Sequence, residues 1–235
     1  MLSMEPYPKV IVALDYENAA DSLVLVDKLL PELCAIKIGL SLFTAAGPNI
    51  VKACIAKGFQ VFLDLKFHDI PNTVASALRV AADLGVFMVN VHALGGFTML
   101  QAAREAIDKN NGPLLIAVTI LTSHEGDDLK AIGITNTIDQ EVKTLAKLAF
   151  NAGCDGIVCS PWEVKDLKKE FGQNFLAVTP GIHLKEDNKD DQKRIMTPQE
   201  ALKAGSDYLV MGRSITRATS PREKLKAIIE ALESE

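Results

Sequence analysis

Eight short apolar segments recur along the chain, and each is separated from the next by a stretch with the spacing of an amphipathic helix. The apolar segments are dominated by β-branched and other apolar residues and start at positions 9, 34, 60, 87, 114, 156, 174 and 208. Two of the intervening stretches, 72–85 and 137–153, each end on Gly, where a helix commonly stops. Such alternation predicts a parallel sheet, and eight units within 235 residues fit an α/β fold, the closed (β/α)8 TIM barrel.

The main alternative to a barrel is an open, doubly wound sheet. That fold usually has fewer strands and needs a ligand loop at its switch point, and no GxGxxG motif follows the first apolar segment. The barrel is therefore the preferred prediction. Because the composition shows no break along the chain and 48% of the residues are hydrophobic, we expect one domain with a large core over residues 1–235.

Charge and composition restrict the partners of the chain. A net charge of -5 provides no basic surface for nucleic acid or an anionic membrane, although a local basic site can still bind phosphate. The first ten residues lack the apolar region of a signal peptide, and no apolar run approaches the roughly 18 residues that span a bilayer. The four cysteines form no CxxC pair. These features predict a reduced, cytoplasmic protein that acts on a small molecule.

The stretch DLKFHD at residues 64–69 places charges at the end of a predicted strand. Alternate side chains of a strand share a face, so Phe62, Asp64 and Lys66 should point one way and Leu63 and Leu65 the other. The apolar pair is expected to meet the helices. Asp64 and Lys66 should then face the barrel interior at the carboxyl end of the strand, where barrel active sites form.

The first two predicted strands bring further charges to the same rim. Asp15 ends the first strand, and Lys37 is expected to point inward from the second. One interpretation of this group is that its side chains form structural ion pairs that fill the end of the barrel. However, burying ions gives little net stability because desolvation offsets their attraction. Alternating Asp and Lys side chains at the functional end of a barrel therefore favour catalysis.

Asp69 follows the third predicted strand and precedes a predicted helix start. Pro71 suits the first turn of a helix, and Asn72 or Thr73 could serve as its cap. On this evidence alone, Asp69 is as well explained as a loop or capping residue as by a catalytic role.

A phosphate site is expected near the last two strands, where barrels commonly hold phosphate through loop amides. The stretch TPGIH at 179–183 and the residues Gly212 and Arg213 occupy those places. Arg213 can contact two phosphate oxygens, and Gly212 allows close backbone approach. The polar run 185–194 is either a surface loop or a lid that closes over bound phosphate.

Other chemistries find little support in the sequence. The four histidines form neither HxH nor HExxH, so no metal site and no other cofactor is predicted. No Ser lies in a GxSxG elbow, which disfavours acyl transfer. Thr122 and Ser123 follow the fifth predicted strand, where their hydroxyls could cap a helix or bind a ligand.

These motifs together resemble the orotidine 5′-phosphate decarboxylase family. The resemblance is carried by ALD at 13–15, KIG at 37–39, DLKFHDIPNTV at 64–74, TILTS at 119–123, TPGI at 179–182, DQKRIMTP at 191–198 and GRSIT at 212–216. The DxKxxD pattern alone also occurs in 3-keto-gulonate-phosphate decarboxylase and hexulose-phosphate synthase. The longer FHDIPNT and DQKRIMTP segments distinguish the chain from those relatives.

The resemblance implies a catalytic array and a dimer. It makes Lys66 the proton donor within a Lys37, Asp64, Lys66 and Asp69 array. In the family, the residues that match Asp69 and Thr73 reach the active site of the other subunit, which implies a homodimer with shared sites.

The resemblance also implies how a nucleotide binds. Asp15 and Lys37 are expected at the ribose, Ser123 and Thr122 at the pyrimidine, and Gln192, Gly212 and Arg213 at the phosphate, under a closing loop around 183–192. Asp64, Ile70, Pro180 and His183 complete the expected substrate-binding residues. His183 departs from the bacterial pattern, in which arginine is common at this position.

The activity implied is cofactor-independent decarboxylation of orotidine 5′-monophosphate to UMP and CO2 in pyrimidine biosynthesis. One alternative is a magnesium-dependent decarboxylase or aldolase of the same superfamily that acts on a sugar phosphate. Another is a barrel that binds a phosphate ligand without reacting, although the intact charged array argues against it.

Overall fold

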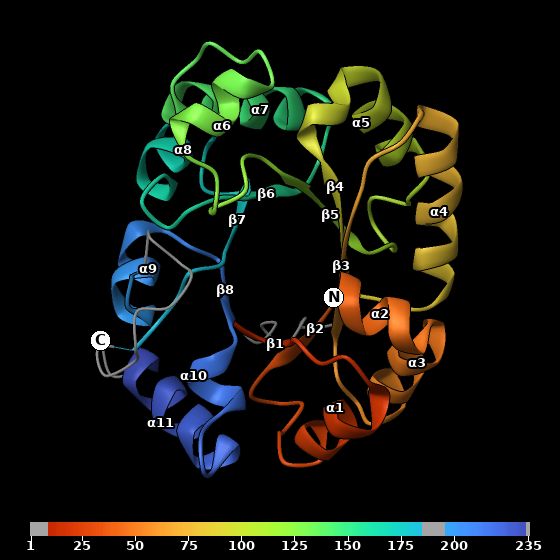
Figure 1. Ribbon diagram of the computed structural model, residues 1–235, viewed down its shortest axis with the longest axis vertical. Helices are drawn as coiled ribbons and strands as arrows, with labels where there is room; N and C mark the ends of the chain where they lie inside the picture. The colour runs from red at the N-terminus through yellow and green to blue at the C-terminus, as the bar shows by residue number, and fades with distance from the viewer. Residues whose placement is uncertain (1–8, 185–195, 234–235) are drawn as a thin grey trace.

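The computed structural model describes residues 9–184 and 196–233 of the chain. Within these ranges, eight parallel strands form a closed barrel in chain order, with β8 paired back to β1 (Figure 1). The strands are β1 (Val10–Leu14), β2 (Ala35–Gly39), β3 (Val61–Phe67), β4 (Met88–His92), β5 (Leu114–Val118), β6 (Gly156–Val158), β7 (Leu176–Thr179) and β8 (Tyr208–Met211). The predicted (β/α)8 barrel and all of its predicted strands are confirmed.

Helices surround the barrel on its outer side (Figure 1). They are α1 (Ala19–Val26), α2 (Leu40–Ala46), α3 (Pro48–Ala56), α4 (Pro71–Asp83), α5 (Gly96–Glu105), α6 (Gly126–Ala131), α7 (Ile138–Asn151), α8 (Val164–Phe171), α9 (Pro198–Ala204), α10 (Arg213–Thr216) and α11 (Pro221–Glu233), with a 3-10 turn η1 (Ala93–Gly95). The helices predicted within 72–85 and 137–153 are α4 and α7. In the part of the chain that the structure describes, no helix has the length and apolar composition needed to cross a bilayer.

The start of α4 differs from the prediction. Neither Asn72 nor Thr73 caps this helix, because the N-cap position belongs to Ile70 and makes no side-chain hydrogen bond to the helix. Pro71 occupies the first helical turn, as expected from its fixed φ and its lack of an N–H. Asp69 instead accepts a hydrogen bond of 2.6 Å from the backbone N–H of Ile70. The carboxylate thus shapes the turn that leads into α4.

Apolar side chains form two cores, one on each face of the sheet. An inner cluster inside the barrel includes Ile11, Phe62 and Met88, and a larger cluster between strands and helices includes Leu63 and Val89. Alternate residues of one strand therefore enter different cores, as the period of a strand requires. The inner apolar layer supports the polar residues that lie nearer the mouth.

Buried ion pairs lie at the end of the barrel where the strands begin. Arg104 of α5 contacts Asp155, which precedes β6, at 2.8 Å, and the same carboxylate oxygen accepts the N–H of Leu115 in β5 at 2.8 Å. Lys168 of α8 contacts Asp207, which precedes β8, at 2.6 Å. These ion pairs connect helices to the starts of strands, far from the open mouth of the barrel. Their role is therefore structural.

The four cysteines are buried and carry free thiols, as expected for small apolar side chains. Burial raises the pKa of Cys34 and Cys154 to about 12 and that of Cys54 to about 11. Burial also raises the pKa of Cys159 well above its ordinary value. Thiolate chemistry is therefore disfavoured at all four positions.

Candidate active site

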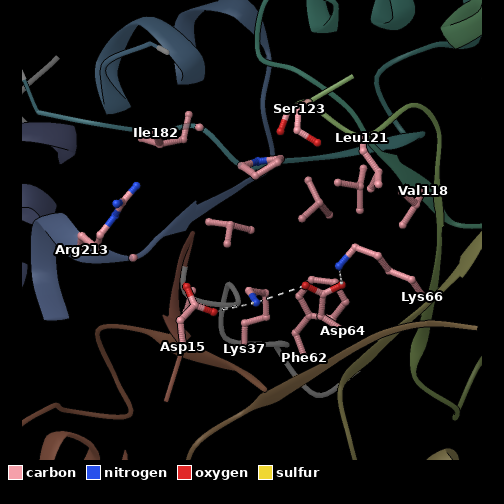
Figure 2. Close-up of a pocket in the computed structure, with 18 of the residues that line it drawn as sticks. Asp15, Lys37, Phe62, Asp64, Lys66, Val118, Leu121, Ser123, Ile182 and Arg213 are labelled. Carbon is pink, nitrogen blue, oxygen red and sulfur yellow. Dashed lines mark hydrogen bonds and ion pairs between the residues drawn. The ribbon is translucent and has the colours of Figure 1, made fainter. Parts of the chain in front are cut away.

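A cavity of about 720 Å³ opens at the carboxyl ends of the strands (Figure 2). Its walls come from β1, β2, β3 and β5 to β8, and from the segments that follow β1, β5, β6, β7 and β8. The predicted site residues that line it are Asp15, Lys37, Asp64, Lys66, Thr122, Ser123, Pro180, His183, Gly212 and Arg213. Residues from distant parts of the sequence thus meet at the end of the barrel where the sequence placed a site.

Asp15, Lys37, Asp64 and Lys66 form a continuous chain of alternating charge along one wall (Figure 2). The Nζ of Lys66 lies 2.6 Å from Oδ1 of Asp64. The other oxygen of this carboxylate lies 3.2 Å from the Nζ of Lys37, which in turn lies 3.6 Å from Oδ1 of Asp15. Asp64 therefore occupies the centre of the chain between two ammonium groups.

Asp64 is charged despite its position in the barrel. Its side chain is only 11% exposed, and this burial by itself would raise the pKa of the carboxyl. The charges of Lys37 and Lys66, together with hydrogen bonds from Lys66 and Asn90, outweigh burial and hold the pKa of Asp64 below its ordinary value. A fixed carboxylate is consequently present before any ligand binds.

Lys66 is carried by an irregular part of β3. Its φ is 51°, a left-handed conformation that costs an L-residue roughly 1–2 kcal/mol. The pairing of β3 with β4 is regular up to Leu63 and resumes only at Phe67. Leu63, Leu65 and Phe67 nevertheless pack toward the helices, while Lys66 lines the cavity. The predicted inward direction of Lys66 is thus observed, on a backbone that departs from the regular strand assumed in predicting it.

Arg213 lies across the cavity from Lys66 (Figure 2). It begins α10 directly after Gly212, which also lines the cavity. Apolar residues that include Val118, Leu121 and Ile182 also line the cavity. The site thus combines a cation at Arg213, a wall of alternating charge that ends at Lys66, and apolar lining residues, an arrangement that suits an elongated, anionic, partly aromatic ligand.

Comparison with known proteins agrees with this geometry. The model of the Orotidine 5'-phosphate decarboxylase / HUMPS family matches residues 8–228. The orotidine 5'-phosphate decarboxylase of Legionella pneumophila strain Paris is 55% identical over 227 residues, which cover 96% of this chain and 99% of the relative. This chain belongs to that family. The orotidine 5'-phosphate decarboxylase of Saccharophagus degradans is 56% identical over 224 residues, which are 95% of this chain and 94% of the relative.

A solved structure extends the family comparison to the fold. The crystal structure of orotidine 5'-phosphate decarboxylase from Lactobacillus acidophilus superposes with a TM-score of 0.86 at 38% identity and covers 96% of this chain and 99% of that one. The family likeness therefore includes the complete barrel on which the charged array lies.

Three residues that the family pattern assigns to the site lie outside this cavity. Asp69, Ile70 and Thr73 are exposed, and neither Asp69 nor Thr73 joins the charged array of its own chain. Asp69 and Ile70 instead line an open hollow of about 620 Å³, beside Leu94. The side of the barrel near β3 and β4 thus presents these residues outward.

Residues of the predicted closing loop are only partly described. Gln192 and the run 185–194 lie outside the described residues. His183 lines the cavity, and its backbone N–H donates to the carbonyl of Met196 at 3.1 Å. Ile182 pairs with Met196 in an isolated bridge. The two ends of the loop therefore meet beside the cavity.

Asn90 is a residue of the site that the sequence reasoning missed. It lies on β4, is 0% exposed, and donates from Nδ2 to Oδ1 of Asp64 at 2.7 Å. Its Oδ1 accepts the backbone N–H of Lys66 at 2.8 Å. A polar residue within the apolar segment FMVNVHA was the available signal, because Asn90 shares the inward face of β4 with Met88.

Proposed function

We propose that this chain decarboxylates orotidine 5′-monophosphate to UMP and CO2 in the cytoplasm, as a single barrel domain and without a cofactor. The observation that carries the proposal is the Lys66 ammonium, which is held against Asp64 and lines a cavity with Arg213 on its other side. Family membership and relatives named orotidine 5'-phosphate decarboxylase support the same activity.

The reaction requires stabilisation of negative charge in the plane of the pyrimidine ring. When the bond between C6 and the carboxylate breaks, its electron pair remains on C6, where the ring π system delocalises it poorly, and CO2 leaves. An ammonium about 4 Å from this charge contributes roughly 4 kcal/mol at an effective dielectric constant of about 20. Lys66 supplies this cation, and its position is set in advance by Asp64.

Lys66 then protonates the carbanion. An N–H bond of the ammonium breaks as the C6–H bond of UMP forms, which leaves a neutral amine to be reprotonated from water. Asp64 lies beside the departing carboxylate in this arrangement, and repulsion between the two anions favours loss of CO2. The array thus combines electrostatic stabilisation with general acid catalysis.

The rest of the substrate extends along the cavity. Asp15 and Lys37 bind the ribose hydroxyls, and Thr122 and Ser123 contact the pyrimidine beside the apolar wall. Gly212, Arg213 and Gln192 bind the phosphate. Ile70, Pro180 and His183 complete the substrate contacts, and closure of the 183–192 loop couples phosphate binding to assembly of the site.

A homodimer completes each active site. Asp69 and Thr73 are exposed at the rim and lie outside the cavity of their own chain, which fits contacts with the site of a partner. Ile70 supports an interface here because it is 67% exposed beside a hollow that Leu94 also lines. In the dimer, Asp69 of each chain extends the array of the other to Lys37, Asp64, Lys66 and Asp69.

The proposal is tested by following the ultraviolet absorbance of orotidine 5′-monophosphate with the protein in EDTA. Wild type should remove the orotate absorbance, and Lys66→Ala should remove almost none of it. Full turnover by Lys66→Ala would reject Lys66 as the proton donor. Unchanged orotate absorbance together with magnesium-dependent turnover of a sugar phosphate would favour the sugar-phosphate alternative, and binding of UMP without any turnover would favour a non-catalytic barrel.

A further inference from the structure

The backbone at Lys66 is held in a conformation that its own sequence does not favour. Among the residues that the structure describes, Lys66 is the only one besides glycines with positive φ, at 51°. The pairing of β3 with β2 extends only to Asp64, and its pairing with β4 passes from Leu63 to Phe67. The regular pairing of β3 with β2 and with β4 therefore does not include Lys66. Another contact must stabilise the left-handed backbone at this residue.

The carboxamide of Asn90 provides that contact and connects Lys66 to Asp64. Its oxygen accepts the Lys66 backbone N–H at 2.8 Å, and its nitrogen donates to Oδ1 of Asp64 at 2.7 Å. This oxygen of Asp64 also accepts from the Lys66 ammonium at 2.6 Å. The amide therefore fixes both the backbone that carries Lys66 and the anion to which its ammonium is bound.

We propose that Asn90 is a positioning residue for the reaction, and that its amide directs the Lys66 ammonium into the cavity by holding the left-handed backbone and the Asp64 carboxylate together. This inference rests on the proposed function, because the direction of the ammonium matters only if Lys66 acts on a bound ligand.

The placement of Asn90 favours positioning over a role in packing. The side chain is 0% exposed and shares the inward face of β4 with Met88, where an apolar residue would pack without desolvating an amide. Both ends of the amide are used within the array, one by Asp64 and one by Lys66. The neighbouring residue on β5, Ile116, belongs to the apolar inner cluster. The amide of Asn90 therefore makes its hydrogen bonds to residues of β3.

The test compares Asn90→Leu with wild type in decarboxylation of orotidine 5′-monophosphate. Leucine keeps the γ-branched shape of asparagine, with bulkier methyl groups in place of the amide oxygen and nitrogen, and removes both hydrogen bonds. We expect kcat to fall about 10- to 100-fold, because contacts with charged and backbone partners are lost. KM should stay within about threefold, because Asn90 does not line the ligand cavity. Asp155→Asn, at the opposite end of the barrel, controls for lost stability alone and should retain kcat.

A second arm asks whether Asn90 acts through Lys66. In the Lys66→Ala background, Asn90→Leu should change the residual rate by less than about twofold, because the group that it positions is absent. An equal loss in both backgrounds would overturn the proposal, as would kcat within about twofold of wild type in Asn90→Leu. If Asn90→Leu does not fold, Asn90→Ser carries the same measurements, since its shorter side chain cannot span both partners.

A third arm is independent of turnover. Hydrogen exchange of the Lys66 backbone N–H, followed by NMR, should accelerate at least about tenfold in Asn90→Leu and remain unchanged in Asp155→Asn. Unchanged protection in Asn90→Leu would reject the role of the amide in holding this backbone. A wild-type protein without decarboxylase activity would reject the proposed function, whereas the exchange experiment would still decide whether Asn90 holds Lys66.

Discussion

The Nζ of Lys66 lies 2.6 Å from Oδ1 of Asp64, while Oδ2 of the same carboxylate lies 3.2 Å from the Nζ of Lys37. One buried anion thus offsets the desolvation of two cations that line a cavity for an anionic ligand. Lys66 keeps a 36% exposed side chain, whereas that of Lys37 is 12% exposed. The more accessible ammonium is the one to which the proposed mechanism assigns proton transfer.

Replacement of Asp64 should separate positioning of Lys66 from folding. We expect Asp64→Asn to lower kcat about 10²- to 10³-fold, because the ammonium loses the anion that fixes it before the substrate arrives. Steady-state kinetics with orotidine 5′-monophosphate measures this effect. A kcat within tenfold of wild type would contradict the assigned role of Asp64.

Asp155 offers a matched control for that substitution. It is also a largely buried aspartate in an ion pair, 2.8 Å from Arg104, but it lies at the far end of the barrel. Asp155→Asn should lower the free energy of unfolding by about 1–3 kcal/mol, because Arg104 keeps its charge without a full partner. Urea denaturation measures this loss, and kcat per folded molecule should not change.

Arg213 should contribute through the phosphate of the substrate. We expect Arg213→Met to lower kcat/KM for orotidine 5′-monophosphate about 10- to 100-fold, because charge-assisted hydrogen bonds to phosphate are lost. Orotidine, which has no phosphate, should react at the same low rate with the variant and with wild type. An equal loss with both substrates would show that Arg213 acts elsewhere in the site.

Shared active sites predict recovery of activity in mixed dimers. Lys66→Ala and Asp69→Ala should each be nearly inactive alone. After unfolding and refolding together, half the dimers are mixed and each has one intact site, so roughly a quarter of wild-type activity should return. Activity that stays at the level of the separate variants, in dimers verified to be mixed, would argue against a contribution of Asp69 across the interface.

Stability should decrease in acid partly because of His92. Burial, followed by the nearby charges of His68 and Lys66, lowers the pKa of His92 from its ordinary 6.5. As the pH falls below about 6.5, the unfolded chain takes up this proton before the folded protein does, so the free energy of unfolding decreases. This contribution is complete above that range and is lost as the pH falls through the folded pKa.

His92→Gln should therefore reduce the pH dependence of stability. Urea unfolding at about pH 8 and about pH 5 measures the loss of stability between the two conditions, and this loss should be smaller in the variant. An identical loss in the variant and in wild type would exclude a contribution from His92. The pKa of Asp64 is also lowered in the folded protein, so the free energy of unfolding should decrease further at lower pH, where this carboxylate becomes protonated.

Local sequence patterns were sufficient to predict the barrel and the direction of its charged side chains. Strand periodicity placed Phe62, Asp64 and Lys66 on the inner face, and all three line the cavity. The two-residue repeat of a strand accounts for Phe62 and Asp64, whereas Lys66 reaches the cavity from a left-handed backbone. The position of the site also followed from the sequence, because all parallel strands of a barrel end at the same rim.

Tertiary structure decided which of these side chains meet and on what backbone. The left-handed conformation of Lys66 depends on how β3 pairs with its neighbours, and the amide of Asn90 reaches it from a strand 24 positions later in the chain. The outward position of Asp69 likewise follows from the turn into α4, although it lies only three residues beyond Lys66. Periodicity along one segment specifies a face, whereas contacts between segments depend on the register in which the closed sheet aligns them.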